Sequence, residues 1–177
     1  MSAATDLLVQ YAAYHRDRRN IATHFVGIPL IVFAVGALLA RPAVPVAGWP
    51  LTPAALLWAA TALWYLTRGN LALGVAVSLV NLGLTLAALP LGHLPVAQWL
   101  AWSLGCFVVG WVIQFIGHYY EGRKPAFVDD LRGLLVGPMF VTAEGLFALG
   151  WGRPLAADIE ARAGPTLLRD LHAPATR

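Results

Sequence analysis

Five apolar runs separated by short polar segments constrain the fold of this chain more than any other feature of its sequence. They cover residues 25–40, 51–67, 71–91, 96–119 and 131–151. A membrane-spanning helix needs about 20 apolar residues, and the first run reaches that length only if residues 21–24 are added. Only 12% of the residues are charged, half the share of about 25% found in soluble domains. The pattern predicts an all-α polytopic membrane protein, one domain with a bundle of four to five transmembrane helices.

The segments outside the runs divide the domain into three parts. Residues 2–19 are predicted to form a short amphipathic helix, so that residues 1–20 lie in the plane of the membrane interface. Residues 21–151 form the transmembrane bundle, and residues 152–177 form a polar surface tail. The fifth run contains a proline and a glutamate, which leaves open whether it crosses the membrane fully. The first ten residues lack a basic region followed by an apolar core, so no cleaved signal peptide is expected.

Basic residues predict the orientation in the membrane. Seven of them fall on one side of the predicted bundle: Arg16, Arg18, Arg19, Arg68, Arg123, Lys124 and Arg132. The short loops of the other side contain Arg41 alone. Because the positive side of a membrane protein is cytoplasmic, we expect a cytoplasmic N-terminus in a bacterial-type inner membrane. The formal net charge of +3 gives no reason to expect a nucleic-acid partner.

The predicted topology sorts the five histidines into those that can meet and those that cannot. His15, His24 and His118 fall at the same cytoplasmic boundary of the bundle. His93 falls at the opposite boundary, about 30 Å away across the bilayer, and His172 lies in the polar tail. Three imidazoles can therefore converge on one site.

The fourth run carries its polar residues on one helical face. Gln114, His118 and Glu121 are spaced i, i+4, i+7, which places them along one side of a helix. His118 and Glu121 can then bind one metal ion, and iron(II), zinc and manganese all accept imidazole with carboxylate. The single cysteine, Cys106, supplies no thiolate site. The spacing gives no compact H-E-x-x-H motif, so it indicates a metal site without naming the metal.

The N-terminal pair of histidines requires a bend in the chain. His15 and His24 are nine residues apart, so on an unbroken helix they point in opposite directions with about 13 Å of rise between them. Asn20 can supply the bend as a cap for the following helix. Residues expected to orient the imidazoles from a second layer are Asn20, Gln114, Asp17 and Tyr119.

Other polar residues near this boundary allow two interpretations each, one functional and one structural. Glu144 in the fifth run is expected to face the bundle interior, either beside the metal site or as a structural hydrogen-bond partner. The histidines themselves can simply contact lipid headgroups or backbone, and the arginines at 16–19 can act only as a topology anchor. Four basic residues also lie at this boundary: Arg123, Lys124, Arg16 and Arg19.

Two stretches of the chain carry a distinctive pattern. The first reads Y-x-x-x-H-x-x-x-x-N-x-x-x-H-x-x-G-x-P from Tyr11 to Pro29, and the second reads Q-F-I-G-H-x-x-E-x-x-x-P-A from Gln114 to Ala126. Together they resemble the membrane 2-hydroxy fatty acid dioxygenase family, over nearly the whole chain. The later Pro138 also fits that family's pattern, as does Glu144.

The resemblance implies an Fe(II)-dependent dioxygenase of fatty acid α-oxidation, which uses O2 to shorten a 2-hydroxy fatty acid by one carbon. The family's essential histidines correspond to His15, His24 and His118, which become the expected catalytic and metal-binding residues. Glu121 matches the family's His-x-x-Glu, and its role as a fourth ligand is our inference. With such a substrate, its carboxylate is expected at the basic residues of the same boundary, Arg123, Lys124, Arg16 or Arg19. The acyl tail is expected in an apolar groove between helices, and homo-oligomerisation stays open.

Two other classes of function remain as alternatives. A non-catalytic membrane protein that binds metal or lipid predicts binding without turnover, although its polar residues would be spread through the membrane depth if it were a transporter. A di-iron hydroxylase or desaturase needs about six or more histidines and carboxylates, more than this boundary offers.

Overall fold

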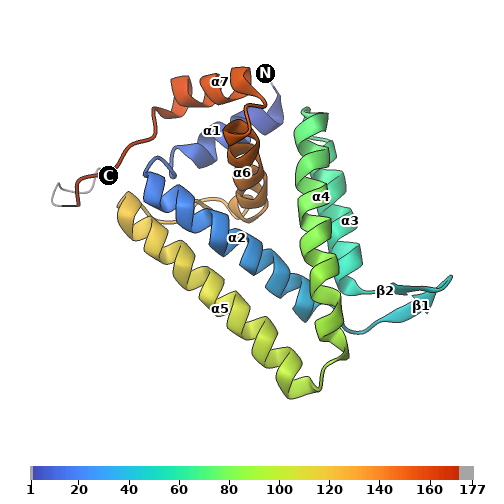
Figure 1. Cartoon of the computed structure of the whole chain (residues 1–177). Helices are drawn as coiled ribbons and strands as arrows, with labels where there is room; N and C mark the ends of the chain where they lie inside the picture. Colours follow the sequence, from blue (N-terminus) through green and yellow to red (C-terminus); the bar gives the residue numbers. More distant parts are fainter. Residues whose placement is uncertain (1, 172–177) are drawn as a thin grey trace.

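The computed structural model describes residues 2–171, which are helical almost throughout (Figure 1). The elements in chain order are α1 (Ala3–Ala12), α2 (Arg18–Leu38), β1 (Val44–Val46), β2 (Trp49–Leu51), α3 (Pro53–Leu66), α4 (Leu71–Ala88), the 3-10 helix η1 (Leu89–His93), α5 (Val96–Glu121), the 3-10 helix η2 (Ala126–Val128), α6 (Gly133–Ala148) and α7 (Arg153–Ala163). The strands β1 and β2 pair antiparallel, with Pro45 opposite Pro50. The all-α class predicted from the apolar runs is confirmed.

Helices α2 and α5 lie side by side in opposite directions and form the longest contact of the fold (Figure 1). Two glycines set how closely they approach. A Cβ atom added to Gly27 would lie 2.9 Å from the carbonyl oxygen of Gly110, and one added to Gly110 would lie 3.0 Å from that of Gly27. Small residues allow such backbone contact between membrane helices. The contact brings the first turns of α2 against the last turns of α5.

A hydrophobic core joins the remaining helices. Helices α3 and α4 form a hairpin, α6 packs against α4 and α2, and α1 packs against α6 and α7. Leu8 of α1, Tyr65 of α3, Leu73 of α4 and Phe140 of α6 are almost completely buried in this core. The core holds α1 and α6 beside the polar end of the α2–α5 pair.

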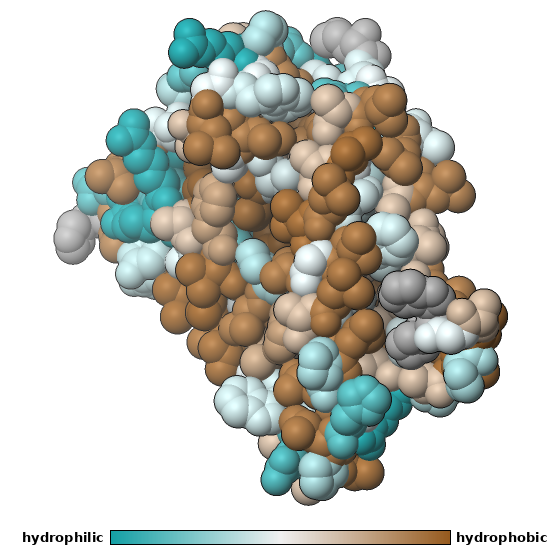
Figure 2. Space-filling view, turned by 45° about the vertical axis from the view of Figure 1, so that its right-hand side comes forward, coloured by the Kyte–Doolittle hydropathy of each residue, from teal (hydrophilic) through white to brown (hydrophobic). Residues whose placement is uncertain are grey.

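Among residues 2–171, three helical segments are long and apolar enough to cross a membrane: Arg18–Leu38, Leu71–His93 and Val96–Glu121. Helices α6 and α7 meet the same criteria together but are bent by 119°, so they add at most one more. This count of three, or at most four, reaches only the lower bound of the four to five spans expected from the sequence, because α3 has 14 residues, only about 21 Å. Figure 2 shows the face on which hydrophobic residues fill the middle and hydrophilic residues gather at the two ends.

Hydrogen bonds place the loops at two opposite ends. The backbone N–H of Ala4 donates to the carbonyl of Arg68 at 2.9 Å, and Arg123 donates to the carbonyl of Ala13 at 2.7 Å. At the other end, Arg41 donates to the carbonyl of Gly92. The grouping of basic residues expected from the sequence is thus present at one end of the bundle. The side of the membrane that this end faces stays a prediction.

The N-terminal segment differs from the single helix expected over residues 2–19. Helix α1 ends at Ala12 and α2 begins at Arg18, with Asp17 as the N-cap whose carboxylate accepts the N–H of Arg19 at 2.8 Å. The bend required between the two histidines therefore exists. It is capped by Asp17 and not by Asn20, which lies inside α2. Helix α1 packs against α6 and α7. Its placement in the plane of the membrane interface stays a prediction.

The C-terminal segment is more than a surface tail. Helix α7 packs against α1 with Ile159 buried, and Gly164 begins an extended segment that reaches the loop before α2. The N–H of Leu167 donates to the carbonyl of Arg16, and the N–H of Arg18 donates to the carbonyl of Leu167, both at 2.9 Å. His172, expected in the tail, lies outside the described residues.

Candidate metal centre

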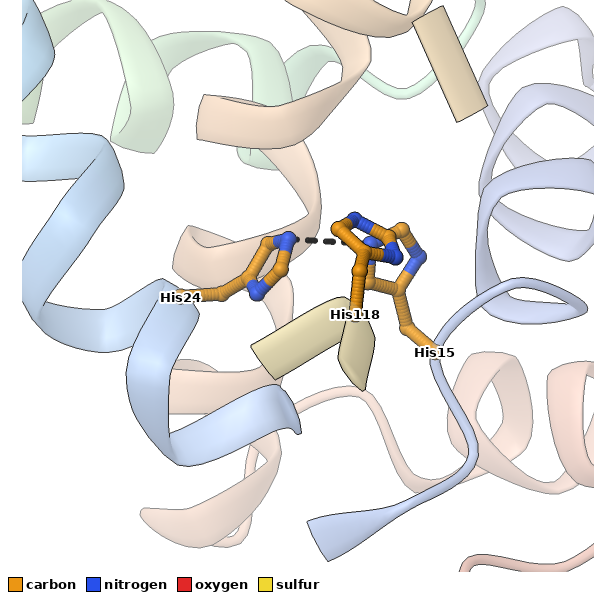
Figure 3. Close-up of side chains that lie close together, drawn as sticks. All are labelled: His15, His24 and His118. Carbon is orange, nitrogen blue, oxygen red and sulfur yellow. Dashed lines mark hydrogen bonds between the residues drawn. The ribbon is translucent and has the colours of Figure 1, made fainter. Parts of the chain in front are cut away.

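Three histidines from three parts of the chain meet in the interior. His15 comes from the loop between α1 and α2, His24 from α2 and His118 from α5 (Figure 3). All three are buried, and each offers a ring nitrogen within 4.8 Å of the others. Within the part of the chain that the structure describes, this is the one group of three or more such residues able to hold a metal ion. The predicted convergence of these three histidines is therefore present in the fold.

Backbone carbonyls orient two of the imidazoles. The Nδ1 atom of His15 lies 2.6 Å from the carbonyl oxygen of Tyr11, and the Nδ1 atom of His24 lies 2.8 Å from that of Asn20. A carbonyl only accepts hydrogen bonds, so each Nδ1 carries the proton. Neutral imidazoles then present bare Nε2 lone pairs, and the two Nε2 atoms face each other at 3.0 Å. Two facing lone pairs repel unless a cation lies between them, so the donor set fits a metal ion.

His118 completes the set from the other side. Its ring centroid lies 5.0 Å from that of His15 and 5.2 Å from that of His24, and both pairs are nearly perpendicular. Its Nδ1 atom is buried with no hydrogen-bond partner among the described residues. A buried, unpaired nitrogen is costly, and a metal ligand role would satisfy it. Three imidazoles from such different directions leave several coordination positions for other ligands.

Burial keeps His15 neutral. Desolvation by the surrounding protein, followed by the neighbouring imidazoles of His24 and His118, lowers the pKa of His15 well below its ordinary value. Tyr11 contributes to this burial, since its ring stacks on that of His15 at 4.1 Å between centroids. A neutral imidazole is the form that binds metals. Tyr11 lies four residues before His15 in the first motif, and this spacing could have indicated that its ring lies beside the imidazole.

Glu121 does not belong to the metal-capable group, in contrast to its expected role as a ligand. Its carboxylate accepts the backbone N–H of Arg16 at 2.9 and 3.0 Å, the N–H of Asp17 at 2.8 Å and the side-chain amide of Asn20 at 2.9 Å. These bonds use both oxygens. Glu121 therefore fixes the backbone directly after His15 to the end of α5, which is a positioning function.

Asp17 and Asn20 act on the same loop. The carboxylate of Asp17 binds Arg19 through an ion pair at 2.7 Å and accepts the backbone N–H of Arg169 at 2.8 Å. The side-chain amide of Asn20 also donates to the carbonyl of Tyr14 at 3.2 Å. Neither side chain contacts an imidazole. Asn20 acts on His24 only through its main-chain carbonyl, which a sequence pattern does not reveal.

A cavity of about 70 Å³ opens on His24 and His118. His24, His118 and Gln114 supply its polar lining, and the rest is mostly apolar, including Tyr11 and Trp111. The side-chain oxygen of Gln114 is buried and has no hydrogen-bond partner among the described residues. Gln114 thus lies beside the site as expected, but it faces the cavity and not an imidazole.

The basic residues expected to hold a substrate carboxylate are engaged elsewhere. The guanidinium of Arg16 donates to the carbonyls of Ala12, His15 and Gly164. Arg19 pairs with Asp17, Arg123 donates to Ala13, and Lys124 pairs with Asp129. None of the four side chains lines the cavity at the histidines as the structure describes it.

Two further candidates lie outside the group of histidines. Glu144 is half-buried on α6 and interacts electrostatically with Arg16, the residue that follows His15. Tyr119 is largely exposed on α5. Neither is placed to orient an imidazole.

Comparison with known proteins agrees with these features. Residues 1–149 match the family described as 2-hydroxy-palmitic acid dioxygenase Mpo1-like. The chain is also 33% identical over 153 residues to the 2-hydroxy-palmitic acid dioxygenase MPO1 of Saccharomyces cerevisiae, covering 85% of this chain and 83% of the relative. No solved structure matches. The matched residues include all three histidines, Gln114 and Glu121, and the chain belongs to the Mpo1-like 2-hydroxy-palmitic acid dioxygenase family.

Proposed function

We propose that this protein is an Fe(II)-dependent dioxygenase that shortens 2-hydroxy fatty acids by one carbon, with the reaction at the cytoplasmic boundary of the membrane. The observation that carries the proposal is the group of three buried histidines with two opposed Nε2 atoms. Family membership supplies the expected substrate class, since the relative's name specifies 2-hydroxy-palmitic acid.

His15, His24 and His118 would hold the iron. Bound there, Fe(II) would offer open positions to the hydroxyl and carboxylate of the substrate and to O2, and would mediate electron transfer between them. The protein supplies no carboxylate to the group, because Glu121 is bound to backbone N–H groups. A neutral set of three imidazoles favours an anionic substrate, since nothing else within the group balances the charge of the ion.

The overall reaction balances without a co-reductant. Cleavage of the C1–C2 bond releases C1 as carbon dioxide, and C2 becomes the carboxyl carbon of the shortened acid. Four electrons leave the substrate, and one O2 accepts them; one oxygen atom enters the new acid and the other leaves as water. No site for a nicotinamide or flavin is needed for this chemistry.

The chain's own residues position the substrate. Gln114 lines the cavity beside His24 and His118 with an unpaired buried oxygen, so it would accept a hydrogen bond from the substrate hydroxyl. Trp111 and Ile28 line the same cavity and would exclude water from the reacting carbons. The hydrogen bonds that the Nδ1 atoms of His15 and His24 donate to the carbonyls of Tyr11 and Asn20 keep the Nε2 atoms directed at the centre.

The proposal is tested with purified protein loaded with Fe(II) under anaerobic conditions and then given 2-hydroxyhexadecanoic acid and O2. Pentadecanoic acid and carbon dioxide should appear in equal amounts, with one O2 consumed per acid. Iron binding without product would favour the alternative of a non-catalytic metal- or lipid-binding protein. A ratio of two irons per chain would favour a di-iron enzyme, although the described residues offer three ligands to the group.

A further inference from the structure

A second, larger cavity lies in the bundle beside the first. Its volume is about 360 Å³, within the range of about 300–1,000 Å³ found for ligand pockets. Helices α2, α3, α4, α5 and α6 all contribute to its wall. The lining is mostly apolar, with Leu39, Leu57 and Phe107 among its side chains.

The two cavities share one wall. Five residues line both of them: Ile31, Val32, Trp111, Leu134 and Pro138. The histidine cavity is thus adjacent to the apolar cavity, with side chains such as Trp111 and Pro138 between them. A molecule with a polar head at the histidines would have its remainder directed into the apolar cavity.

The length of the combined path fits a long hydrocarbon chain. The lining runs along α2 from His24 to Leu39, about 22 Å at 1.5 Å per residue. One leaflet of a bilayer has a hydrocarbon depth of about 15 Å, which is the depth that long acyl chains fill. The path therefore accommodates an acyl chain of the length found in membrane lipids.

The few polar groups along the apolar cavity are not placed to bind a second polar head. The hydroxyl of Tyr65 donates to the carbonyl of Leu135 at 2.9 Å, and that of Thr61 donates to the carbonyl of Trp58 at 3.0 Å. Asn81 also interacts with Tyr65. Since these groups already have partners, the cavity favours an unbranched apolar tail with no distal charge.

We propose that the apolar cavity binds the tail of a long-chain 2-hydroxy fatty acid whose hydroxyl and carboxylate lie at the three histidines. This inference rests on the proposed function, because it assigns the head of the same molecule to the metal centre. Val35 on α2 and Thr61 on α3 line the middle of the cavity, and its far end beside Leu39 and Ala54 then limits the length of chain that binds.

The test narrows the apolar cavity about halfway along its length and compares two substrates. Val35→Phe and Thr61→Phe add bulk from two different walls, and Val109→Phe places the same side chain on the exposed face of α5. Each protein is given 2-hydroxyhexadecanoic acid and 2-hydroxyoctanoic acid. Each methylene excluded from an apolar site costs about fourfold in affinity.

We expect Val35→Phe and Thr61→Phe to lower kcat/KM for the 16-carbon acid at least tenfold and for the 8-carbon acid less than threefold. Val109→Phe should change neither by more than threefold. If both cavity variants leave the ratio between the two acids unchanged, the tail lies elsewhere and the inference is wrong. An equal loss for both acids would also overturn it, because the substitution would then act on the metal centre or the fold.

A binding measurement separates this inference from the proposed function. Trp58 and Trp111 line the apolar cavity, so a 16-carbon 2-hydroxy acid with a terminal bromine should quench tryptophan fluorescence without O2. Val35→Phe should reduce that quenching at least threefold, while Val109→Phe should not. Quenching with this pattern but without turnover would contradict the proposed enzymatic activity and still support binding of the acyl tail in the apolar cavity. Quenching equal in all variants would mean that the acid enters the surrounding detergent or lipid only.

Discussion

One end of the α2–α5 pair buries polar side chains, whereas the middle of the bundle exposes apolar ones. At the end where α2 begins and α5 ends, polar residues are inside: His15, Asp17, Asn20, His24, Gln114, His118 and Glu121 are all at most 9% exposed. We call these seven residues the polar core. Along the middle of the bundle, apolar residues are outside, as with Leu63 at 65% and Leu79 at 61% exposed. We call this outer layer the apolar shell.

The difference shows what each region requires from its neighbours. Apolar residues of the shell need no partner if lipid surrounds them. Residues of the polar core have lost water and must satisfy one another, and most do, as Glu121 does with three donor groups. The exceptions are the His118 Nδ1, the Gln114 side-chain oxygen and the Asn20 side-chain oxygen, and the first two belong to residues that line the cavity. Unsatisfied atoms in an otherwise satisfied region mark where an ion and a substrate would bind.

The largest expected effect comes from removing an imidazole of the polar core. His15→Ala, His24→Ala and His118→Ala should each lower turnover of 2-hydroxyhexadecanoic acid at least a thousandfold, because two histidines hold the iron poorly. His93→Ala, at the other end of the bundle, should change turnover less than twofold. Product formation per iron added is the measurement. Near-normal turnover in any of the three variants would remove that histidine from the centre.

The next effect concerns Glu121 and separates positioning from ligation. Glu121→Gln keeps the volume but replaces one acceptor oxygen by a donor that faces the N–H groups of Arg16 and Asp17. We expect iron affinity to fall about 10- to 100-fold, the usual cost of losing an outer partner of a metal site. Electron paramagnetic resonance of the iron–nitric oxide adduct should keep the wild-type spectrum at saturating iron. A changed spectrum would instead indicate that Glu121 is a ligand.

A smaller effect is expected from pH. The pKa of His15 is lowered in the fold by burial and by the neighbouring histidines, whereas an unfolded histidine binds a proton near pH 6.5. Below that pH the unfolded chain binds more protons, so the metal-free protein loses up to about 1.4 kcal/mol of stability per pH unit from this group. Thermal unfolding in detergent between pH 7 and pH 5 measures the slope. His15→Gln should flatten it, and an unchanged slope would contradict a buried neutral His15.

The smallest effect comes from the C-terminal segment, which lies outside the family-matched residues 1–149. A chain ending at Gly164 loses the bonds of Leu167 with Arg16 and Arg18 and those of Arg169 with Asp17 and Arg19, while one ending at Leu171 keeps them. We expect iron affinity to fall about two- to tenfold in the shorter chain, the equivalent of one net hydrogen bond, because Glu121 still holds the loop. Equal affinity in both truncated chains would show that the segment does not affect His15.

Some of this could be predicted from the sequence. The lengths of the apolar runs predicted the helical class. The unequal distribution of basic residues between the two sides of the bundle predicted that His15, His24 and His118 lie at the same end. The spacing of Gln114 and His118 on one face was also informative. These features depend on local periodicity and on membrane depth, which a single sequence contains.

Other features depend on contacts between distant segments, so spacing could not reveal them. Glu121 was expected to bind metal because it follows His118 on the same face, but its partners are backbone N–H groups about 105 residues away. Arg16 was expected near the substrate, yet its guanidinium donates hydrogen bonds to the backbone carbonyls of Ala12 and Gly164. The cap at Asp17 had a readable signal, since aspartate is a common N-cap.

The central claim is that imidazoles from two distant segments hold one iron ion. X-ray absorption spectroscopy of the Fe(II)-loaded protein without substrate tests it most directly, combined with iron analysis. We expect one iron per chain and scattering from three imidazole rings, reduced to two rings or lost in His118→Ala. Two irons per chain, or a spectrum that keeps three imidazoles in His118→Ala, would contradict the account.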